Sequence, residues 1–474
     1  MSLRVLAVYV IVVSLSVYAW KDWFKSLCGL IVLVAVVEYR GMPRSVLGIQ
    51  GLNPWNVLFL STVLAWAASR SARGLTWDMP RRLSIVLLLY LGVILFGFLR
   101  ALFDRSYIED YPLTHLISEE LINTLKWACP GVLLFDGCRT RKQVIMALAC
   151  VLVLYLLIAL QTTVNLPLGG VLSDSDTMNY ARVKLNRRMG YNASDVSTML
   201  AGASWGMLAV LPLIRKKRYW PAIFMMVGLI FVGQALTGGR AGYIAWAATG
   251  FVLCVLKWRK QLILVPVLMM LLPIVFPSAV DRMFAGFGET DAAGQGTVDD
   301  YAMTSGRLVA WPRVIDKIGE SPLIGHGRLG MLRTGVSAGL MADLDESFPH
   351  PHNVYLETLL DNGILGSLPI CVFWTIVIIC SARLFRNDNH LYSAVGGLTL
   401  SLALAQVVGG IGSQHYFPRE STMALWTSAF LAMRVFVEEK QSQAMTSKVA
   451  MASNEPLAMS PQEVILQAPR STLP

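Results

Sequence analysis

The sequence is a succession of apolar runs of about 16 to 25 residues, the length that an α-helix needs to cross a bilayer core of roughly 30 Å. Of the 474 residues, 55% are hydrophobic and only 15% are charged. A soluble protein carries about 25% charged residues. The first run lacks the small-residue cleavage site of a signal peptide, so we expect it to be retained. We predict an all-α, polytopic membrane protein with twelve or thirteen transmembrane helices.

Basic residues in the short connections predict how these helices are oriented, because Lys and Arg concentrate in cytoplasmic loops. Clusters such as Arg215–Arg218 then fall on the cytoplasmic side, and the segments 164–194, 237–240 and 278–352 fall on the periplasmic side. The net charge of +10 therefore sets topology and contact with membrane lipids, and we expect no nucleic-acid partner. The predicted spans are 3–20, 25–39, 55–69, 83–99, 121–137, 144–163, 195–214, 219–236, 241–256, 261–277, 354–382, 391–410 and 421–437.

The domain organisation follows from these runs. We expect residues 1–437 to form one transmembrane domain with periplasmic loops at about 164–194 and 278–352, the second of which contains short helices. Residues 438–474 are rich in Ser, Gln, Met, Ala and Pro, and we predict a disordered cytoplasmic tail there. The seven cysteines lie in or beside apolar runs without metal-ligand spacing. We predict no disulfide, no metal and no cofactor.

A polar stretch between two apolar runs, Ser305–Gly366, is punctuated by Gly and Pro and contains His326, His350 and His352. Imidazole is the side chain that exchanges a proton near neutral pH. Long loops are often functional, although any one of these histidines is equally compatible with a solvated loop position. His352 differs from the others because Asn353 and a run of leucines carry the chain directly into an apolar helix. That places His352 at the mouth of a helix, next to the membrane.

Motifs in this stretch carry a resemblance to a known family. They are Ser-Gly-Arg at 305–307 followed by Trp311, Pro-Leu-x-Gly-x-Gly at 322–327, and His-Asn-x-Tyr-Leu-Glu-x5-Gly-x-Leu-Gly at 352–366. Together they resemble the O-antigen ligase and polymerase superfamily. Its members are bacterial inner-membrane glycosyltransferases that use polyprenyl-diphosphate-linked glycans. The resemblance implies a multi-pass protein of the inner membrane with a periplasmic active site.

Two arginines stand at outward-facing positions. Arg240 follows two glycines at a span end, where it either snorkels to the interface or grips a diphosphate with its planar fork of donors. Arg307 either forms a surface salt bridge, to Asp299 or Asp300, or binds the donor as part of the Ser-Gly-Arg motif. The resemblance implies that both arginines serve the lipid-linked donor.

Further residues are candidates for substrate binding. Arg187 and Arg188 precede a helix that we expect to start at Ser194 or Asp195, and a helix N-terminus favours anions. The same two arginines are also compatible with a basic loop that meets lipid head groups. Trp311 belongs to the same motif as Arg307, and Asn353 follows His352. The candidates for substrate binding are therefore Arg187, Arg188, Trp311 and Asn353.

These residues are compatible with one mechanism. The resemblance implies transfer of O-antigen glycan from undecaprenyl diphosphate to lipid A–core. His352 is the candidate general base for the acceptor hydroxyl, and Arg240 and Arg307 would stabilise the leaving diphosphate without metal. One displacement would invert the anomeric centre. An O-antigen polymerase and a protein O-oligosaccharyltransferase are alternatives. A polysaccharide transporter is the non-enzymatic alternative, but it would favour ionisable groups deep in the spans and two related halves, which the sequence does not show.

Overall fold

The computed structural model describes residues 3–37, 49–74, 76–166, 175–264, 306–344, 348–412 and 416–454, with isolated positions and short strands between them. The described residues form helices joined by turns and irregular segments, with two short antiparallel strand pairs. The pairs are β1 (Ser45–Val46) with β2 (Ile49–Gln50), and β3 (Glu289–Thr290) with β4 (Gly296–Thr297). The prediction of an all-α fold is confirmed.

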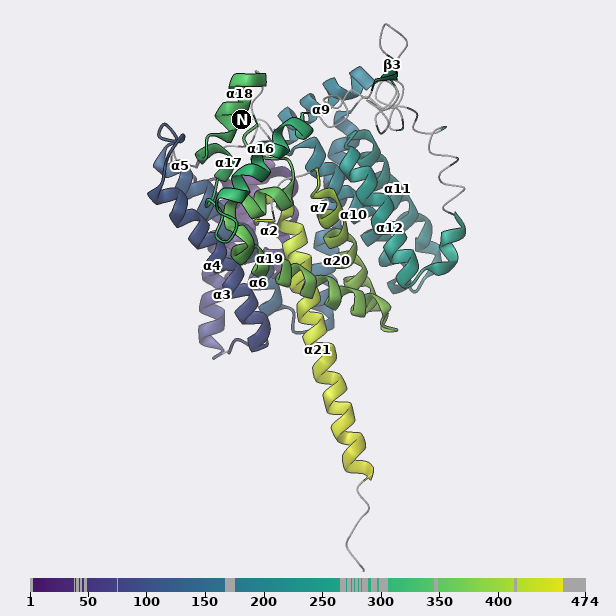
Figure 1. The fold of residues 1–474 in the computed structure, drawn as a ribbon. Helices are drawn as coiled ribbons and strands as arrows, with labels where there is room; N and C mark the ends of the chain where they lie inside the picture. Colours follow the sequence, from purple (N-terminus) through teal and green to yellow (C-terminus); the bar gives the residue numbers. More distant parts are fainter. Residues whose placement is uncertain are drawn as a thin grey trace, which may run out of the picture.

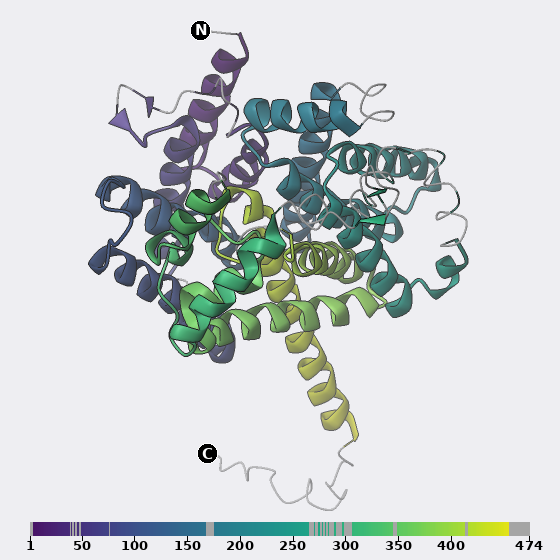
Figure 2. The same cartoon turned by 45° about the horizontal axis from the view of Figure 1, so that its top comes forward.

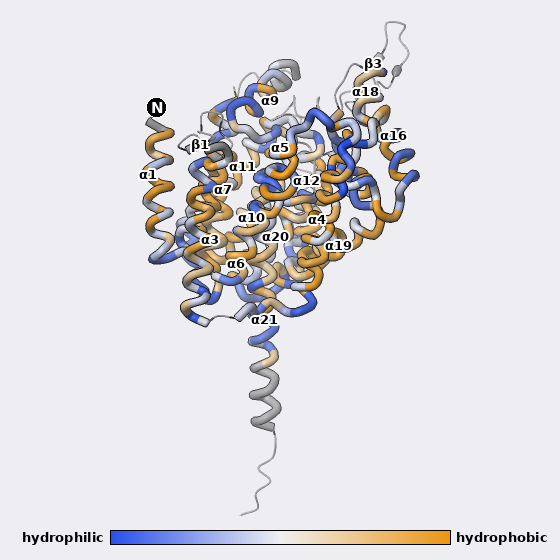
Figure 3. Tube along the Cα trace, turned by 90° about the vertical axis from the view of Figure 1, so that its left-hand side faces the viewer, coloured by the Kyte–Doolittle hydropathy of each residue, from blue (hydrophilic) through white to orange (hydrophobic). Residues whose placement is uncertain are grey.

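The body of the protein is a bundle of helices (Figure 1). Its helices are α1 (Leu3–Tyr18), α2 (Trp23–Val37), α3 (Pro54–Ala72), α4 (Arg81–Phe103), α6 (Thr124–Gly137), α7 (Arg141–Asn165), α10 (Ala193–Ala209), α11 (Trp220–Leu236), α12 (Arg240–Leu256), α19 (Val354–Arg386), α20 (His390–Gly409) and α21 (Met423–Asn454). Hydrophobic residues form a broad belt across the bundle, and hydrophilic residues gather towards its two ends (Figure 3). Large apolar side chains such as Leu88, Met225 and Phe251 are exposed on the outside, as expected of a surface that faces lipid.

Six helical segments of the described residues are long and apolar enough to cross a membrane. They are α4, α7, α10 with the 3-10 turn η2 (Leu211–Leu213), α11 with the 3-10 turn η3 (Lys217–Tyr219), α19 and α20. The shorter apolar helices α1, α2 and α12 coincide with three more predicted spans. The predicted spans 55–69, 121–137 and 421–437 are also helical and correspond to α3, α6 and α21. The predicted span 261–277 begins in η4 (Arg259–Leu264) and lies mostly outside the described residues. The chain is a multi-pass membrane protein.

Short helices gather at one end of the bundle, which we call the loop end (Figure 1). They are α5 (Leu113–Ile117), the π-helix η1 (Ser118–Asn123), α9 (Ser175–Met189), α16 (Arg307–Glu320), α17 (Gly330–Arg333) and α18 (Val336–Leu344). The predicted short helices of the large loop are therefore present in its described part. Figure 2 shows α16, α17 and α18 lying over the start of α19. α21 projects from the opposite end.

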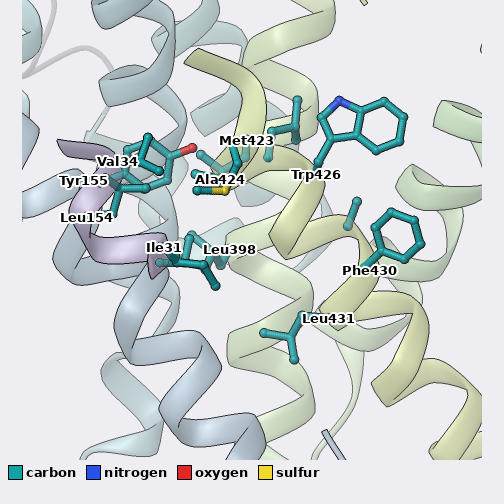
Figure 4. Packing of buried hydrophobic residues seen from close by; sticks show 14 of the residues in the cluster. Ile31, Val34, Leu154, Tyr155, Leu398, Met423, Ala424, Trp426, Phe430 and Leu431 are labelled. Atoms are coloured by element: carbon teal, nitrogen blue, oxygen red, sulfur yellow. The ribbon is translucent and has the colours of Figure 1, made fainter. Parts of the chain in front are cut away.

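The centre of the bundle is closely packed. Side chains from α2, α7, α20 and α21 meet there (Figure 4). The labelled residues are Ile31, Val34, Leu154, Tyr155, Leu398, Met423, Ala424, Trp426, Phe430 and Leu431. α10 and α20 approach so closely that a Cβ on Gly202 would lie 2.9 Å from the Leu402 Cα. Small residues allow this approach, and in a membrane such packing takes the place of the hydrophobic effect in holding helices together.

α19 is broken at Gly363, whose backbone is non-helical (φ 60°, ψ −169°). The Pro-Leu-x-Gly-x-Gly segment, 322–327, fits against this break. Four backbone hydrogen bonds join the two segments: His326 N to Leu360 O and Gly327 N to Asp361 O at 2.7 Å, Ile364 N to Pro322 O at 2.9 Å, and Leu365 N to Leu323 O at 3.0 Å. The motif thus satisfies the backbone groups that the break would leave unpaired.

Arg328 follows this segment and is buried. Its Nε donates to Glu120 of η1 at 2.5 Å, its Nη1 lies 3.6 Å from an Asp361 carboxylate oxygen, and its guanidinium stacks 4.0 Å from the Phe417 ring centroid. Breaking a buried ion pair on one side costs about 3–5 kcal/mol. Arg328 therefore ties η1, α19 and the segment before η5 (Glu420–Thr422) into one rigid base beneath the loop end.

α21 continues to Asn454, so the predicted tail at 438–474 starts inside a helix. The reason is local: Arg434 Nε donates to Glu438 at 3.0 Å and Gln443 Nε2 donates to Glu439 at 3.4 Å, each four residues apart on one helix face. Glu, Lys, Gln and Ala are also strong helix formers. Residues 455–474 lie outside the described residues.

Candidate active site

The turn before α19 carries His350, Pro351 and His352. His352 has a left-handed backbone (φ 52°), which costs a non-glycine residue about 1–3 kcal/mol and persists only where the surroundings hold it. Asn353 follows as the N-cap of α19, since its side-chain oxygen accepts from the backbone N–H groups of Tyr355 (3.0 Å) and Leu356 (3.2 Å). Asn353, a candidate for substrate binding, thus fixes the start of the helix.

α16 holds this turn from one side. Arg307 and Trp311 are four residues apart in α16 and share a helix face. The indole Nε1 of Trp311 donates to the Pro351 carbonyl at 2.9 Å, between the two histidines. The spacing of the Ser-Gly-Arg motif and its tryptophan therefore has a structural reason. It places Arg307 one turn away from the residue that anchors the histidine turn.

The two histidine rings lie edge to face, with centroids 4.1 Å apart and planes at 87°. Burial lowers the pKa of His352, the positive charges of His350 and Arg307 lower it further, and Glu357 opposes them, with the result that the pKa falls to about 3. Burial also lowers the pKa of His350, where Glu357 opposes the shift and Arg419 adds to it. His352 is therefore neutral at pH 7 and able to accept a proton.

The backbone of Gly412 lies between Arg307 and the start of α12. Arg307 Nη2 donates to the Gly412 carbonyl at 3.4 Å. A Cβ on Gly412 would lie 2.9 Å from the Ala241 Cβ and 3.6 Å from Arg307 Nη1. A Cβ on Gly412 would therefore meet both Arg307 and Ala241, the residue after Arg240, and Arg240 lies close enough to Arg307 to lower its pKa.

These two arginines place positive charge close together. Burial lowers the pKa of Arg307, and the charge of Arg240 lowers it further. The Nε of Arg307 is buried and makes no hydrogen bond within the described part of the chain. Asp299 and Asp300, the alternative partners of Arg307, lie outside the described residues. Two partly buried guanidinium groups close together, one of them with an unused Nε donor, suit an anion with several oxygens, such as a diphosphate.

The turn before Arg240 is held by α9 and α10. Gly238 has a left-handed φ of 63°, and a Cβ on Gly239 would lie 2.6 Å from the Cβ of Ser197. Arg182 of α9 donates through Nη1 to the carbonyls of Thr237 (3.0 Å) and Gly238 (2.5 Å). The sequence patterns did not single out Arg182. The one feature of the sequence that could have indicated its role is that it lies beside the apolar positions of the otherwise polar segment 175–189.

The other predicted residues have separate places. Arg187 is exposed, and Arg188 Nη1 donates to Asn165 at the end of α7 at 3.0 Å. α10 starts at Ala193 and is capped by Asn192, not by Ser194 or Asp195 as predicted, because the Asn192 side chain accepts from the Ser194 N–H at 2.9 Å. His326 serves the break in α19, and its Nε2 lies 2.8 Å from the Lys317 carbonyl.

Among the residues that the structure describes, no group of three or more His, Cys, Asp or Glu side chains is arranged to hold a metal ion. The candidate arginines Arg240 and Arg307 and His352 fall within one stretch of the chain. Residues 225–371 match the family model described as O-antigen ligase. A search of curated proteins found no match.

The matched stretch contains the candidate residues Arg240, Arg307, Trp311, His352 and Asn353. Arg187 and Arg188 precede it. The match does not separate ligases from polymerases. Over residues 225–371, this chain is similar to the O-antigen ligase family.

Proposed function

We propose that the protein transfers O-antigen glycan from undecaprenyl diphosphate to lipid A–core at the periplasmic face of the bacterial inner membrane. One observation carries the proposal. Arg240 and Arg307 are partly desolvated and close enough for the charge of one to lower the pKa of the other, and a neutral His352 lies within the electrostatic reach of Arg307. An anion-binding pair and a proton acceptor at one place are what a lipid-diphosphate glycosyl transfer requires. The family match supports this class of reaction.

The transfer is one displacement. The acceptor hydroxyl oxygen attacks the anomeric carbon and forms the new glycosidic bond. The bond from that carbon to the diphosphate oxygen breaks, and its electron pair leaves with the diphosphate. The hydroxyl proton passes to the imidazole of His352, a role that contributes about 10²–10⁴-fold to the rate. The anomeric configuration inverts.

The arginines stabilise the leaving group. Negative charge grows on the diphosphate as the bond breaks, and Arg240 and Arg307 provide fixed positive charge in a partly dry setting, where it acts most strongly. The bound diphosphate also changes the pKa of His352. The charge of Arg307 lowers the pKa of His352 in the empty site, and a bound diphosphate compensates that charge. Donor binding then raises the pKa of His352 towards neutrality, where a general base is most effective.

The protein's role is tested in a strain that lacks it, by examining its lipopolysaccharide. A ligase leaves polymer on its lipid carrier and core without O-antigen. An O-antigen polymerase leaves core that bears a single repeat. Lipopolysaccharide of wild-type length and amount contradicts both assignments. We favour the ligase because the motif residues Arg307, Trp311 and His352 lie in one compact loop.

A further inference from the structure

α9 reaches from the loop end to the turn that precedes Arg240 (Figure 1). Its buried face consists of Ala181, Leu185 and Met189, each four residues from the next. Arg182 lies beside that face. Its Nη1 donates to the carbonyls of Thr237 and Gly238, as described above, and its Nη2 donates to Ser194 Oγ of α10 at 3.1 Å. One guanidinium therefore joins α9 and α10 to the α11–α12 turn.

Arg182 binds the carbonyl side of this turn. The carbonyls of Thr237 and Gly238 follow the last residue of α11, where a helix leaves carbonyl groups unpaired and its dipole favours a cation. Gly238 and Gly239 have no side chains, and glycine gives the backbone wide freedom. Other contacts of the turn include the hydrogen bond from Ser197 Oγ to the Gly239 carbonyl at 3.3 Å and that from Thr237 Oγ1 to the Gln234 carbonyl at 2.6 Å.

We propose that Arg182 is a positioning residue, whose hydrogen bonds fix the Thr237–Gly239 turn and so set the direction in which Arg240 meets the donor diphosphate. The inference rests on the proposed role of Arg240. Arg182 acts through the turn and does not itself contact the donor, because its Nη1 is already occupied by two carbonyls. A displacement of about 1 Å at a reacting group can cost about 10²-fold in rate.

A double-mutant cycle tests this inference. Arg182→Gln is measured alone and in an Arg240→Lys background, with undecaprenyl-diphosphate-linked glycan as donor and lipid A–core as acceptor. Alone, Arg182→Gln is expected to raise KM for the donor and to lower kcat/KM by about 10- to 100-fold. In the Arg240→Lys background the further loss is expected to be below about threefold, because the geometry that Arg182 maintains is no longer used. Equal losses in both backgrounds overturn the inference.

A matched control separates positioning from general loosening. Arg105 also clamps backbone carbonyls at the loop end, those of Ile108, Glu109 and Tyr111, without a link to the α11–α12 turn. Arg105→Gln is expected to leave the donor KM unchanged, and an increase equal to that of Arg182→Gln overturns the inference. If Arg182→Gln does not fold, Arg182→Lys replaces it in the same cycle. Full activity of Arg240→Ala instead refutes the proposed role of Arg240.

Discussion

Replacing Trp311 with phenylalanine removes one hydrogen-bond donor and keeps an aromatic ring in place. The indole N–H of Trp311 donates to the Pro351 carbonyl at 2.9 Å, and Pro351 is buried between the two histidines. A buried carbonyl that loses its partner costs about 1–3 kcal/mol. If that cost falls wholly on the turn that holds His352 left-handed, kcat falls by about 5- to 160-fold, since each 1.36 kcal/mol is tenfold.

The rate of glycan transfer to acceptor, measured in membranes of the deletion strain, checks this expectation. The donor KM should change little, because Arg240 and Arg307 remain in place. Trp220→Phe is the matched control, since the Nε1 of Trp220 donates to the Ile214 carbonyl at 3.3 Å and a 17-residue helix separates it from the α11–α12 turn. Wild-type kcat for Trp311→Phe would refute the positioning argument. An increase confined to the acceptor KM would indicate substrate stacking instead.

Further predictions concern the arginines, the base and the break in α19. Arg240→Lys and Arg307→Lys keep the charge but lose the planar fork, so transfer should fall well below wild type; two fully active variants would reduce both residues to point charges. Because the pKa of His352 is lowered from 6.5 to about 3, its neutral form persists in acid, and kcat/KM for the donor should stay level from pH 7 to about pH 5. A decline that begins near pH 6.5 would contradict the shift. Gly363→Ala should lower the melting temperature, since its Cβ would lie 2.4 Å from a neighbouring carbonyl, whereas Gly319→Ala, with open space around it, should not.

The helical bundle was predictable because apolar runs of membrane-spanning length leave few alternatives. The break in α19 was not, because Gly363 stands in an apolar run that is compatible with one continuous helix. Its partner, the 322–327 segment, was visible as a motif, but the sequence does not show that its backbone pairs with both sides of the break. The composition of the segment after residue 438 does not indicate that α21 continues there. Side-chain hydrogen bonds between residues four apart support this part of the helix.

The candidate site likewise has residues that the sequence identified and residues that it did not. The resemblance identified Arg240, Arg307 and His352, which lie far apart in the sequence, and the structure places Arg240 and His352 within the electrostatic reach of Arg307. Arg182 and Gly412 were missed, since each acts through contacts with backbone groups remote in sequence. Such contacts leave no periodicity or spacing by which a single sequence reveals them.

The most direct test of the proposed mechanism is glycan transfer by His352→Ala, measured in membranes of the deletion strain beside His326→Ala. His326 lies in the segment that pairs with the break in α19, and its imidazole lies near the Lys317 carbonyl, so its loss should leave substantial activity. His352→Ala should abolish transfer while expression and donor binding persist, because Arg240 and Arg307 are unchanged. Normal transfer by His352→Ala would contradict the general-base mechanism and leave catalysis to the arginines.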